Sequence, residues 1–209
     1  MNSEQVKITK IRKATDEDSN IIASLIMLAM DDIIYSFIGE VSYEKAFHFL
    51  NRLIREKSNQ YSYENCWVAE AENQLVAAAI VYDGARLKEL RNPVAILLRE
   101  IFNRDFNPED ETQEGEYYID CVGVDSNYQG KGIGSQVFQF IINEFVLQQN
   151  KTLGLLVDKK NPKAKQLYLK LGFEVVGEKK LVGNEMEHLQ YKNIERWNSY
   201  AKICKSPYP

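Results

Sequence analysis

The sequence has few of the residues that mark several familiar classes of protein. Its 209 residues contain only two histidines and three cysteines, Cys66, Cys121 and Cys204, which are widely spaced. An odd number of dispersed cysteines does not suggest a disulfide framework, so we expect buried thiols in a reducing compartment. His48 and His188 are isolated and belong to no cluster with metal-ligand spacing. The sequence therefore predicts no metal site.

An excess of basic residues and a long apolar segment are also lacking. The formal net charge of -4 argues against a basic face that follows nucleic-acid phosphates. The N-terminal residues lack the charged-then-apolar pattern of a secretion signal, and no apolar run approaches the roughly 18 residues of a membrane span. We expect a cytoplasmic protein whose partners are neither a nucleic acid nor a membrane.

No segment rich in proline, glycine or serine divides the chain. Hydrophobic residues make up 44% of the sequence and charged residues 27%, a composition typical of globular proteins. We therefore expect one large domain over residues 1–209.

Two segments within this domain have weaker patterns. Residues 84–115 include a short predicted helix from Pro93 to Phe102 and an acidic loop over residues 107–114, and we interpret them as a variable insertion or lid. The acids between Glu109 and Glu116 could attract a cationic amine or be merely solvated. Residues 195–209 predict a C-terminal tail helix. That helix, or the free edge of the last hairpin, could support a homodimer.

The order of the predicted elements indicates a sheet of mixed direction. Two helices, one after Thr15 and one after Gly39, precede a hairpin over residues 66–82. A strand that ends at Val124, a helix that ends near Asn150 and an apolar strand over residues 152–157 then form a βαβ unit with parallel strands. A helix over residues 161–171 and a hairpin over residues 173–191 complete the sheet.

The most informative stretch follows the strand that ends at Val124. Three alternating glycines, Gly130, Gly132 and Gly134, come directly before a long amphipathic helix. The first N–H groups of a helix have no intrahelical partner and carry partial positive charge, so they attract phosphate. Glycines allow positive φ and a close approach of the backbone to a ligand, and neighbouring side chains can add donors. The pattern predicts an anion-binding cradle, with a flexible glycine turn as the alternative.

Two motifs in this region resemble those of the GNAT superfamily of acyl-CoA-dependent N-acetyltransferases. Gln129-Gly-Lys-Gly-Ile-Gly134 is similar to the pyrophosphate motif of that family. Asn161, followed by Ala164, Leu167-Tyr168 and Gly172-Phe173, is similar to a second motif. A dinucleotide site fits less well, because residues 125–129 separate the strand from the first glycine and Ser135 stands where a third glycine is needed.

The resemblance implies a fold and a ligand. It implies an α/β (α+β) fold, with a mostly antiparallel central sheet, a parallel βαβ core at the CoA site and helices on both faces. Acetyl-CoA would be the acyl donor, and its pantetheine arm would align with Val122 and Val124. Asn161 would reach the pantetheine or only cap its helix. The pyrophosphate would bind the backbone amides of Gln129, Gly130, Lys131, Gly132, Ile133, Gly134 and Ser135.

The resemblance also implies direct transfer of the acetyl group to a primary amine of a small molecule or peptide. Asp120 is the candidate general base, because a lone acid in an apolar strand is costly to bury; a structural ion pair is the alternative. Glu116 is the second candidate, or an exposed acid at the edge of a loop. Tyr168 would protonate the thiolate, or be a core tyrosine. Alternation along a strand should point Cys121 away from Asp120, into the core.

A rival interpretation is a non-catalytic acyl-CoA-binding or regulatory protein that keeps the cradle and has lost the transfer reaction. The intact Asp120 and Tyr168 argue against it.

Overall fold

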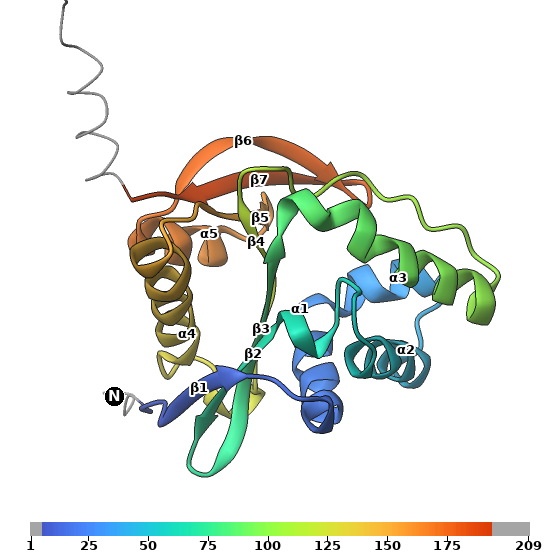
Figure 1. Ribbon diagram of the computed structural model, residues 1–209, viewed down its shortest axis with the longest axis horizontal. Coiled ribbons are helices and arrows are strands. Elements are labelled where there is room, and N and C mark those ends of the chain that lie inside the picture. Colours follow the sequence, from blue (N-terminus) through green and yellow to red (C-terminus); the bar gives the residue numbers. More distant parts are fainter. Residues whose placement is uncertain (1–5, 194–209) are drawn as a thin grey trace, which may run out of the picture.

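The computed structural model describes residues 6–193, and its centre is a seven-stranded sheet in the order β1-β2-β3-β4-β5-β7-β6 (Figure 1). Every neighbouring pair is antiparallel except β4 and β5, which are parallel. The predicted mixed sheet with one parallel βαβ unit is confirmed. The predicted tail helix over residues 195–209 lies outside the described residues. The strands are β1 Lys10–Lys13, β2 Cys66–Ala71, β3 Gln74–Asp83, β4 Tyr117–Val124, β5 Leu153–Asp158, β6 Glu174–Leu181 and β7 Asn184–Tyr191.

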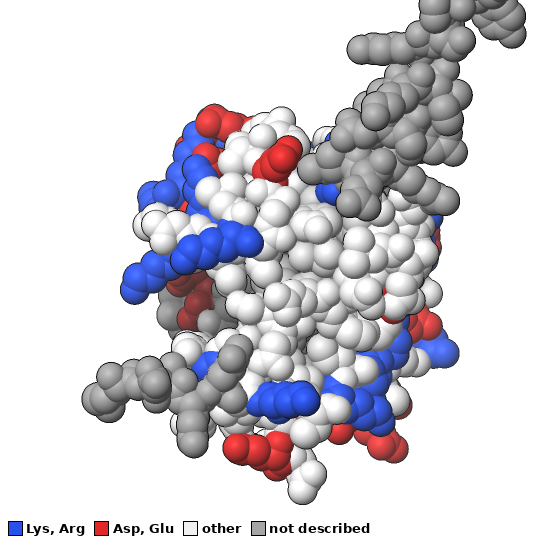
Figure 2. All heavy atoms as spheres, turned by 90° about the vertical axis from the view of Figure 1, so that its left-hand side faces the viewer, with Lys and Arg blue, Asp and Glu red and all other residues white. Residues whose placement is uncertain are grey.

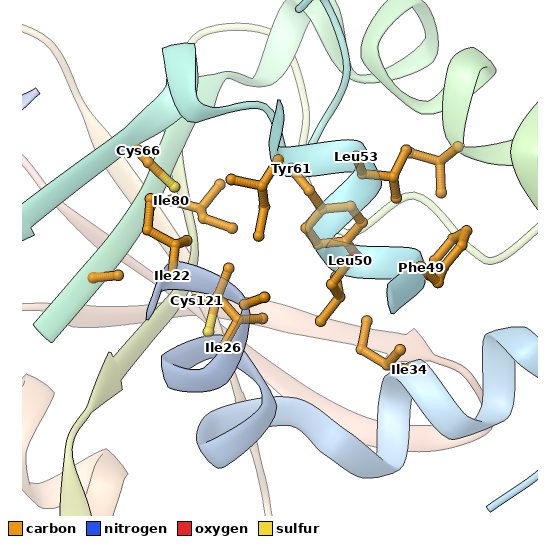
Figure 3. Close-up of a cluster of buried hydrophobic side chains, with 14 of the residues drawn as sticks. Ile22, Ile26, Ile34, Phe49, Leu50, Leu53, Tyr61, Cys66, Ile80 and Cys121 are labelled. Atoms are coloured by element: carbon orange, nitrogen blue, oxygen red, sulfur yellow. The ribbon is translucent and has the colours of Figure 1, made fainter. Parts of the chain in front are cut away.

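Helices cover both faces of the sheet, as expected (Figure 1). On one face lie α1 Ser19–Ile38, α2 Tyr43–Arg55 and α3 Leu87–Phe102, and on the other lie α4 Ile133–Ile141 and α5 Pro162–Leu171. Each face has its own core cluster of apolar side chains. Figure 3 shows the first cluster, in which Ile22 and Ile26 of α1 and Leu50 of α2 lie near Ile80 of β3 and Cys121 of β4.

Helix α1 corrects one expectation from the sequence. Together with the 3-10 turn before it, the helical segment Asp16–Ile38 has a mean hydropathy of 1.9 over 18 residues and is long and apolar enough to cross a membrane. The expectation that no apolar run approaches this length is therefore wrong. Half of that window is buried inside the fold, and Ile22 and Ile26 are fully covered, so the structure uses the segment as a core helix.

Helix α3 also differs from its prediction. It begins at Leu87 and holds Pro93 in its interior, whereas a proline usually marks the first turn. The irregular segment that follows, residues 103–116, is hereafter the strap. The strap is a solvated acidic loop only in part: Glu109, Asp110 and Glu114 are exposed, whereas Glu111 and Glu116 are 4% and 2% exposed. Arg91 of α3 holds it by donating to the carbonyl oxygens of Pro108 and Glu109, each at 3.1 Å.

The contact between α1 and β4 depends on one glycine. An added Cβ at Gly123 would lie 2.1 Å from the carbonyl oxygen of Leu25, far inside van der Waals contact. Gly123 does not have a positive φ, so close approach of the α1 backbone, and not strain, requires glycine here. This contact places the cavity-lining part of α1 over β4.

We predict that Gly123→Ala lowers the free energy of unfolding by about 1–3 kcal/mol, because α1 must move away from β4. Gly177→Ala is the matched control, since an added Cβ at Gly177 of β6 meets nothing within 4 Å. Urea unfolding of both variants measures the difference. Equal stability of the two would show that α1 and β4 do not depend on this contact.

Candidate active site

The site begins where β4 and β5 separate. The two parallel strands pair only at Tyr117 with Leu153 and at Tyr118 with Gly154. Beyond these residues they diverge, which leaves an opening between them. The remaining peptide groups on that edge of β4 are thus left without a neighbouring strand.

A β-bulge in β4 lies at the start of this opening. Ile119 pairs with Val81 and Cys121 pairs with Ile80, so Asp120 is an extra residue without a partner on β3. An extra residue shifts the alternation of side chains by one position. Asp120 and Cys121 consequently both line the same cavity, and the prediction that Cys121 points away from Asp120 is wrong. Cys121 does belong to the core cluster, as expected, with 6% exposure.

The bulge also directs the peptide groups further along β4. The N–H of Asp125 donates to the carbonyl oxygen of Val76 on the β3 side, at 2.9 Å. Because peptide groups alternate along a strand, those of Val122 and Val124 face the other side, toward the opening. The side-chain amide of Gln129 donates to the Val124 carbonyl oxygen at 3.1 Å. Apart from this carbonyl oxygen, the backbone groups of Val122 and Val124, the predicted pantetheine partners, face the opening without a neighbouring strand.

The glycine-rich turn has the geometry of an anion cradle. Gly130 and Gly132 have φ of 74° and 83°, the left-handed region that favours glycine. Among the described residues, no backbone N–H of residues 129–135 donates to a backbone carbonyl. Gly134 has no positive φ, and an added Cβ there would meet only Val124, at 3.9 Å. Neither strain nor packing requires glycine at that position, so the residues present fit the close approach of a pyrophosphate.

Charged side chains contribute little to this part of the surface. Figure 2 shows the face over α4 and α5, whose centre is largely uncharged and whose Lys and Arg side chains lie toward the rim. Lys131 lies in the cradle, with its Nζ 5.3 Å from the centroid of the Tyr128 ring. The backbone amides of the cradle are thus the main donors that the fold offers to an anion.

A cavity of about 520 Å³ continues from the opening toward α1 and the strap. Asp120, Val122, Asn161 and Tyr168 line it, so the structure brings these predicted site residues together. Glu116 does not line it. The other lining residues used below are Asp31, Asp32, Gln60, Tyr61, Glu111, Tyr118, Asp158 and Lys160.

Asp120 belongs to a hydrogen-bonded network that the sequence did not reveal. The side-chain amide of Gln60 donates both to Asp120 Oδ2 and to Glu111 Oε1, each at 2.8 Å. Tyr82 donates to the same Glu111 oxygen at 3.1 Å, and Arg91 pairs with the other one. Burial, and then the negative charge of Glu111, raise the pKa of Asp120 to about 7. Asp120 can therefore accept a proton near neutral pH.

Glu116 differs from Asp120 in its position outside the cavity lining and in the direction of its pKa shift. It accepts hydrogen bonds from Thr112 at 2.8 Å and Gln190 at 2.6 Å, and His188 Nε2 lies 2.8 Å from its Oε2. Burial alone would raise the pKa of Glu116, but these hydrogen bonds outweigh it and hold the pKa below its usual range. The expectation of an exposed acid is wrong. Glu116 joins the strap to β7, and we do not propose it as the base.

Tyr168 and Asn161 lie on and before α5. The Tyr168 ring packs against Phe138, with ring centroids 5.1 Å apart, and burial, with the nearby Cys121 thiol, raises its pKa to about 12. The Tyr168 hydroxyl thus stays protonated at neutral pH and can act as a donor. Asn161 Oδ1 accepts from the N–H of Ala164 at 3.1 Å, so its capping role is confirmed. Contact between Asn161 and a pantetheine arm stays a prediction.

The sequence pattern that describes the acetyltransferase (GNAT) family matches residues 32–173, which include β4, the cradle and α5. The chain belongs to this family. The family and the fold support acetyl transfer as the general activity. No curated protein sequence matches the chain.

Solved structures agree with this assignment. One described as an acetyltransferase is 29% identical with a TM-score of 0.74, and the match covers 88% of this chain and 99% of that one. An N-acetyltransferase from Staphylococcus aureus Mu50 is 22% identical with a TM-score of 0.78, over 88% of this GNAT chain and 100% of that one. A histone acetyltransferase HPA2 and related acetyltransferase from Corynebacterium glutamicum is 20% identical with a TM-score of 0.66, over 88% and 96%. The last two, at these identities, support the fold alone.

We predict that Gly134→Leu weakens the binding of acetyl-CoA by at least about tenfold, because its bulky side chain would occupy space beside the free amides of the cradle. The stability of the free protein should not fall, since the residue has an ordinary helical conformation and a Cβ there meets only Val124, at 3.9 Å. Calorimetry measures the binding and thermal unfolding measures the stability, with Gly177→Leu as the control. Unchanged affinity in Gly134→Leu would contradict a pyrophosphate site at this turn.

Proposed function

We propose that the protein transfers the acetyl group of acetyl-CoA to a primary amine of a small molecule or peptide, by direct attack in a ternary complex. The observation that carries the proposal is the position of Asp120. Its carboxylate, with a pKa of about 7, lies in the cavity at the point where β4 separates from β5. A base with a pKa near the working pH is the group that an ammonium substrate requires.

Different residues on the donor side bind different parts of acetyl-CoA. The amides of residues 129–135 bind the pyrophosphate, and the free peptide groups of Val122 and Val124 pair with the pantetheine arm. Main-chain N–H groups at the opening also stabilise negative charge on the acetyl oxygen. Acetyl-CoA supplies a thioester whose carbonyl carbon accepts a nucleophile and whose sulfur leaves as a thiolate.

The residues on the acceptor side move the protons. Asp120 takes a proton from the substrate ammonium, which frees the nitrogen lone pair for attack. A C–N bond forms, the C–S bond breaks, the new amide nitrogen loses its second proton to solvent, and the Tyr168 hydroxyl gives its proton to the departing thiolate. Solvent restores the proton of Tyr168 and removes that of Asp120. The sum is an amide, CoA and one released proton.

Two other functions fit parts of the structure. A non-catalytic acyl-CoA-binding protein needs the cradle and not Asp120, and a dinucleotide-binding protein needs only an anion site.

Incubation with acetyl-CoA and a pool of primary amines, with free thiol as the readout, tests the proposed transfer. Release of CoA only with an amine present supports it, and acetyl-CoA binding without release would identify a binding protein. Stabilisation by NAD and not by acetyl-CoA would indicate a dinucleotide site.

A cytoplasmic location and a homodimer stay predictions. Within residues 6–193, β6 ends the sheet and one of its edges pairs with no other strand, so this edge is a candidate for pairing with a second copy.

We predict that Asp120→Asn lowers kcat/KM by about a hundredfold between pH 7 and the pKa of the amine, while acetyl-CoA binding is retained. In the wild type, kcat/KM should rise with pH through about 7 as Asp120 ionises. In the variant, this rise of kcat/KM around pH 7 should disappear, and kcat/KM should follow the fraction of the amine that is unprotonated. A pH profile identical to that of the wild type would contradict Asp120 as the base.

We also predict how the stability of Asp120→Asn relative to the wild type changes with pH. Because the pKa of Asp120 is raised from its usual value of about 4 to about 7, the folded state opposes its ionisation. The wild type should lose stability as pH rises over this window, and Asp120→Asn should not. The Tm advantage of the variant is therefore absent at pH 4 and complete above pH 7. An advantage that is independent of pH would contradict the raised pKa.

We predict that Tyr168→Phe lowers kcat by about a hundredfold and leaves the affinity for acetyl-CoA unchanged, because the variant keeps the ring and loses only the proton donor. Tyr43→Phe, at an exposed position on α2, is the control. Steady-state turnover and calorimetry measure the two quantities. Unchanged turnover in Tyr168→Phe would leave the residue as a core tyrosine only.

A further inference from the structure

Gln60 offers a buried acceptor that no part of the described fold uses. The residue lines the cavity and is 3% exposed. Its amide nitrogen donates to two carboxylates, Asp120 and Glu111, which fixes the orientation of the side chain, because a flipped amide would turn its oxygen toward both of them. Its Oε1 is buried and has no donor among the described residues. A buried acceptor without a donor is costly, so this atom calls for a ligand that donates.

An alkylammonium group has the complementary chemistry. It carries several N–H donors and no acceptor, so it can donate to Gln60 Oε1 and to Asp120 together. The cavity walls beside these groups include the buried rings of Tyr61 and Tyr118. Aromatic faces attract cations, and they also cover the methylene groups next to the nitrogen.

A second acidic position in the lining of the cavity lies on α1. The helix kinks at Met30, where φ is -149° and ψ is 32°. Directly after the kink, Asp31 and Asp32 line the cavity and are exposed to solvent. Neither forms an ion pair within residues 6–193. Unpaired carboxylates at this position are free to bind a cation.

The lining of the cavity as a whole carries a net negative charge. Its acids are Asp31, Asp32, Glu111, Asp120 and Asp158, and its only basic residue among those described is Lys160. Glu111 is already paired with Arg91, and Asp158 accepts a hydrogen bond from the backbone N–H of Lys160, which leaves Asp120 and the two aspartates of α1 to meet the substrate. Such a field draws cations into the cavity and repels an amine whose other end is a carboxylate.

We propose that the acceptor is an aliphatic amine with at least two positive charges, a diamine or a longer polyamine. Its reacting nitrogen binds between Gln60 Oε1 and Asp120, and its second ammonium group binds at Asp31 and Asp32. The inference rests on the proposed amine acetylation and adds the class of the acceptor to it. Gln60, Asp31 and Asp32 thereby become residues that select the substrate.

The first test compares amines of equal chain length that differ at the far end. Diamines from diaminobutane to diaminooctane are set against butylamine, hexylamine and octylamine, and against aminohexanoic acid. At low ionic strength, the best diamine should have a KM about tenfold lower than the matching monoamine, and added NaCl should reduce the difference. Aminohexanoic acid should be the poorest substrate. Equal KM values for the diamines and the monoamines would overturn the proposal.

The second test removes the second charge site. The double variant D31N/D32N should raise the KM for the diamine about fivefold, without changing that for the monoamine or for acetyl-CoA, because exposed carboxylates contribute modest and salt-dependent attraction. The double variant E17Q/E174Q removes two exposed carboxylates that form no ion pair within residues 6–193 and lie outside the cavity lining, and it should leave all three unchanged. The same rise in E17Q/E174Q would show a general effect of net charge and contradict a site at α1.

A failure of the proposed function can be distinguished from a failure of the proposed acceptor site. If acetyl-CoA binds and no amine releases CoA, the protein does not acetylate amines, and the acceptor site is then decided by calorimetry with diaminohexane in the presence of CoA. Binding that is weakened in D31N/D32N and is stronger than that of hexylamine supports a site for dications. Absence of binding, or equal binding of both amines, overturns it.

Discussion

One extra residue in a strand determines the arrangement of this site. Asp120 interrupts the pairing of β4 with β3, and the interruption shifts both the side chains and the peptide groups that follow it. The shift turns Asp120 and Cys121 into one cavity, and it turns the backbone of Val122 and Val124 toward the opening beside β5. Without the bulge, the carboxylate and the free backbone groups would not lie along the same opening.

The network around Asp120 links the reaction site to the strap. Gln60 bridges Asp120 and Glu111, and Arg91 pairs with Glu111 while it also holds the strap backbone. Burial, and then the negative charge of Glu111, keep the pKa of Asp120 high even though Gln60 donates to it. The arrangement costs stability whenever Asp120 is ionised, a common consequence of burying an acid in a mostly apolar region. The strap therefore forms a wall of the cavity and also helps to raise the pKa of Asp120, the proposed base.

Local patterns in the sequence were sufficient for the cradle and for α5. The positive φ of Gly130 and Gly132 and the cap at Asn161 depend on residues a few positions away, so the sequence predicts them directly. The bulge at Asp120 depends on its register with β3, some forty residues earlier, and no local signal marks it. Gln60 gave no signal either, because only the tertiary fold brings it beside Glu111 and Asp120.

We propose that the opening between β4 and β5 holds the acyl donor, with Asp120 next to its reacting end. A crystal structure of the protein with CoA would decide this. We expect the pyrophosphate at the backbone amides of residues 129–135, the pantetheine arm hydrogen-bonded to Val122 and Val124, and the sulfur at the cavity that Asp120 and Tyr168 line. CoA bound elsewhere, or a sulfur directed away from this cavity, would contradict this position of the donor.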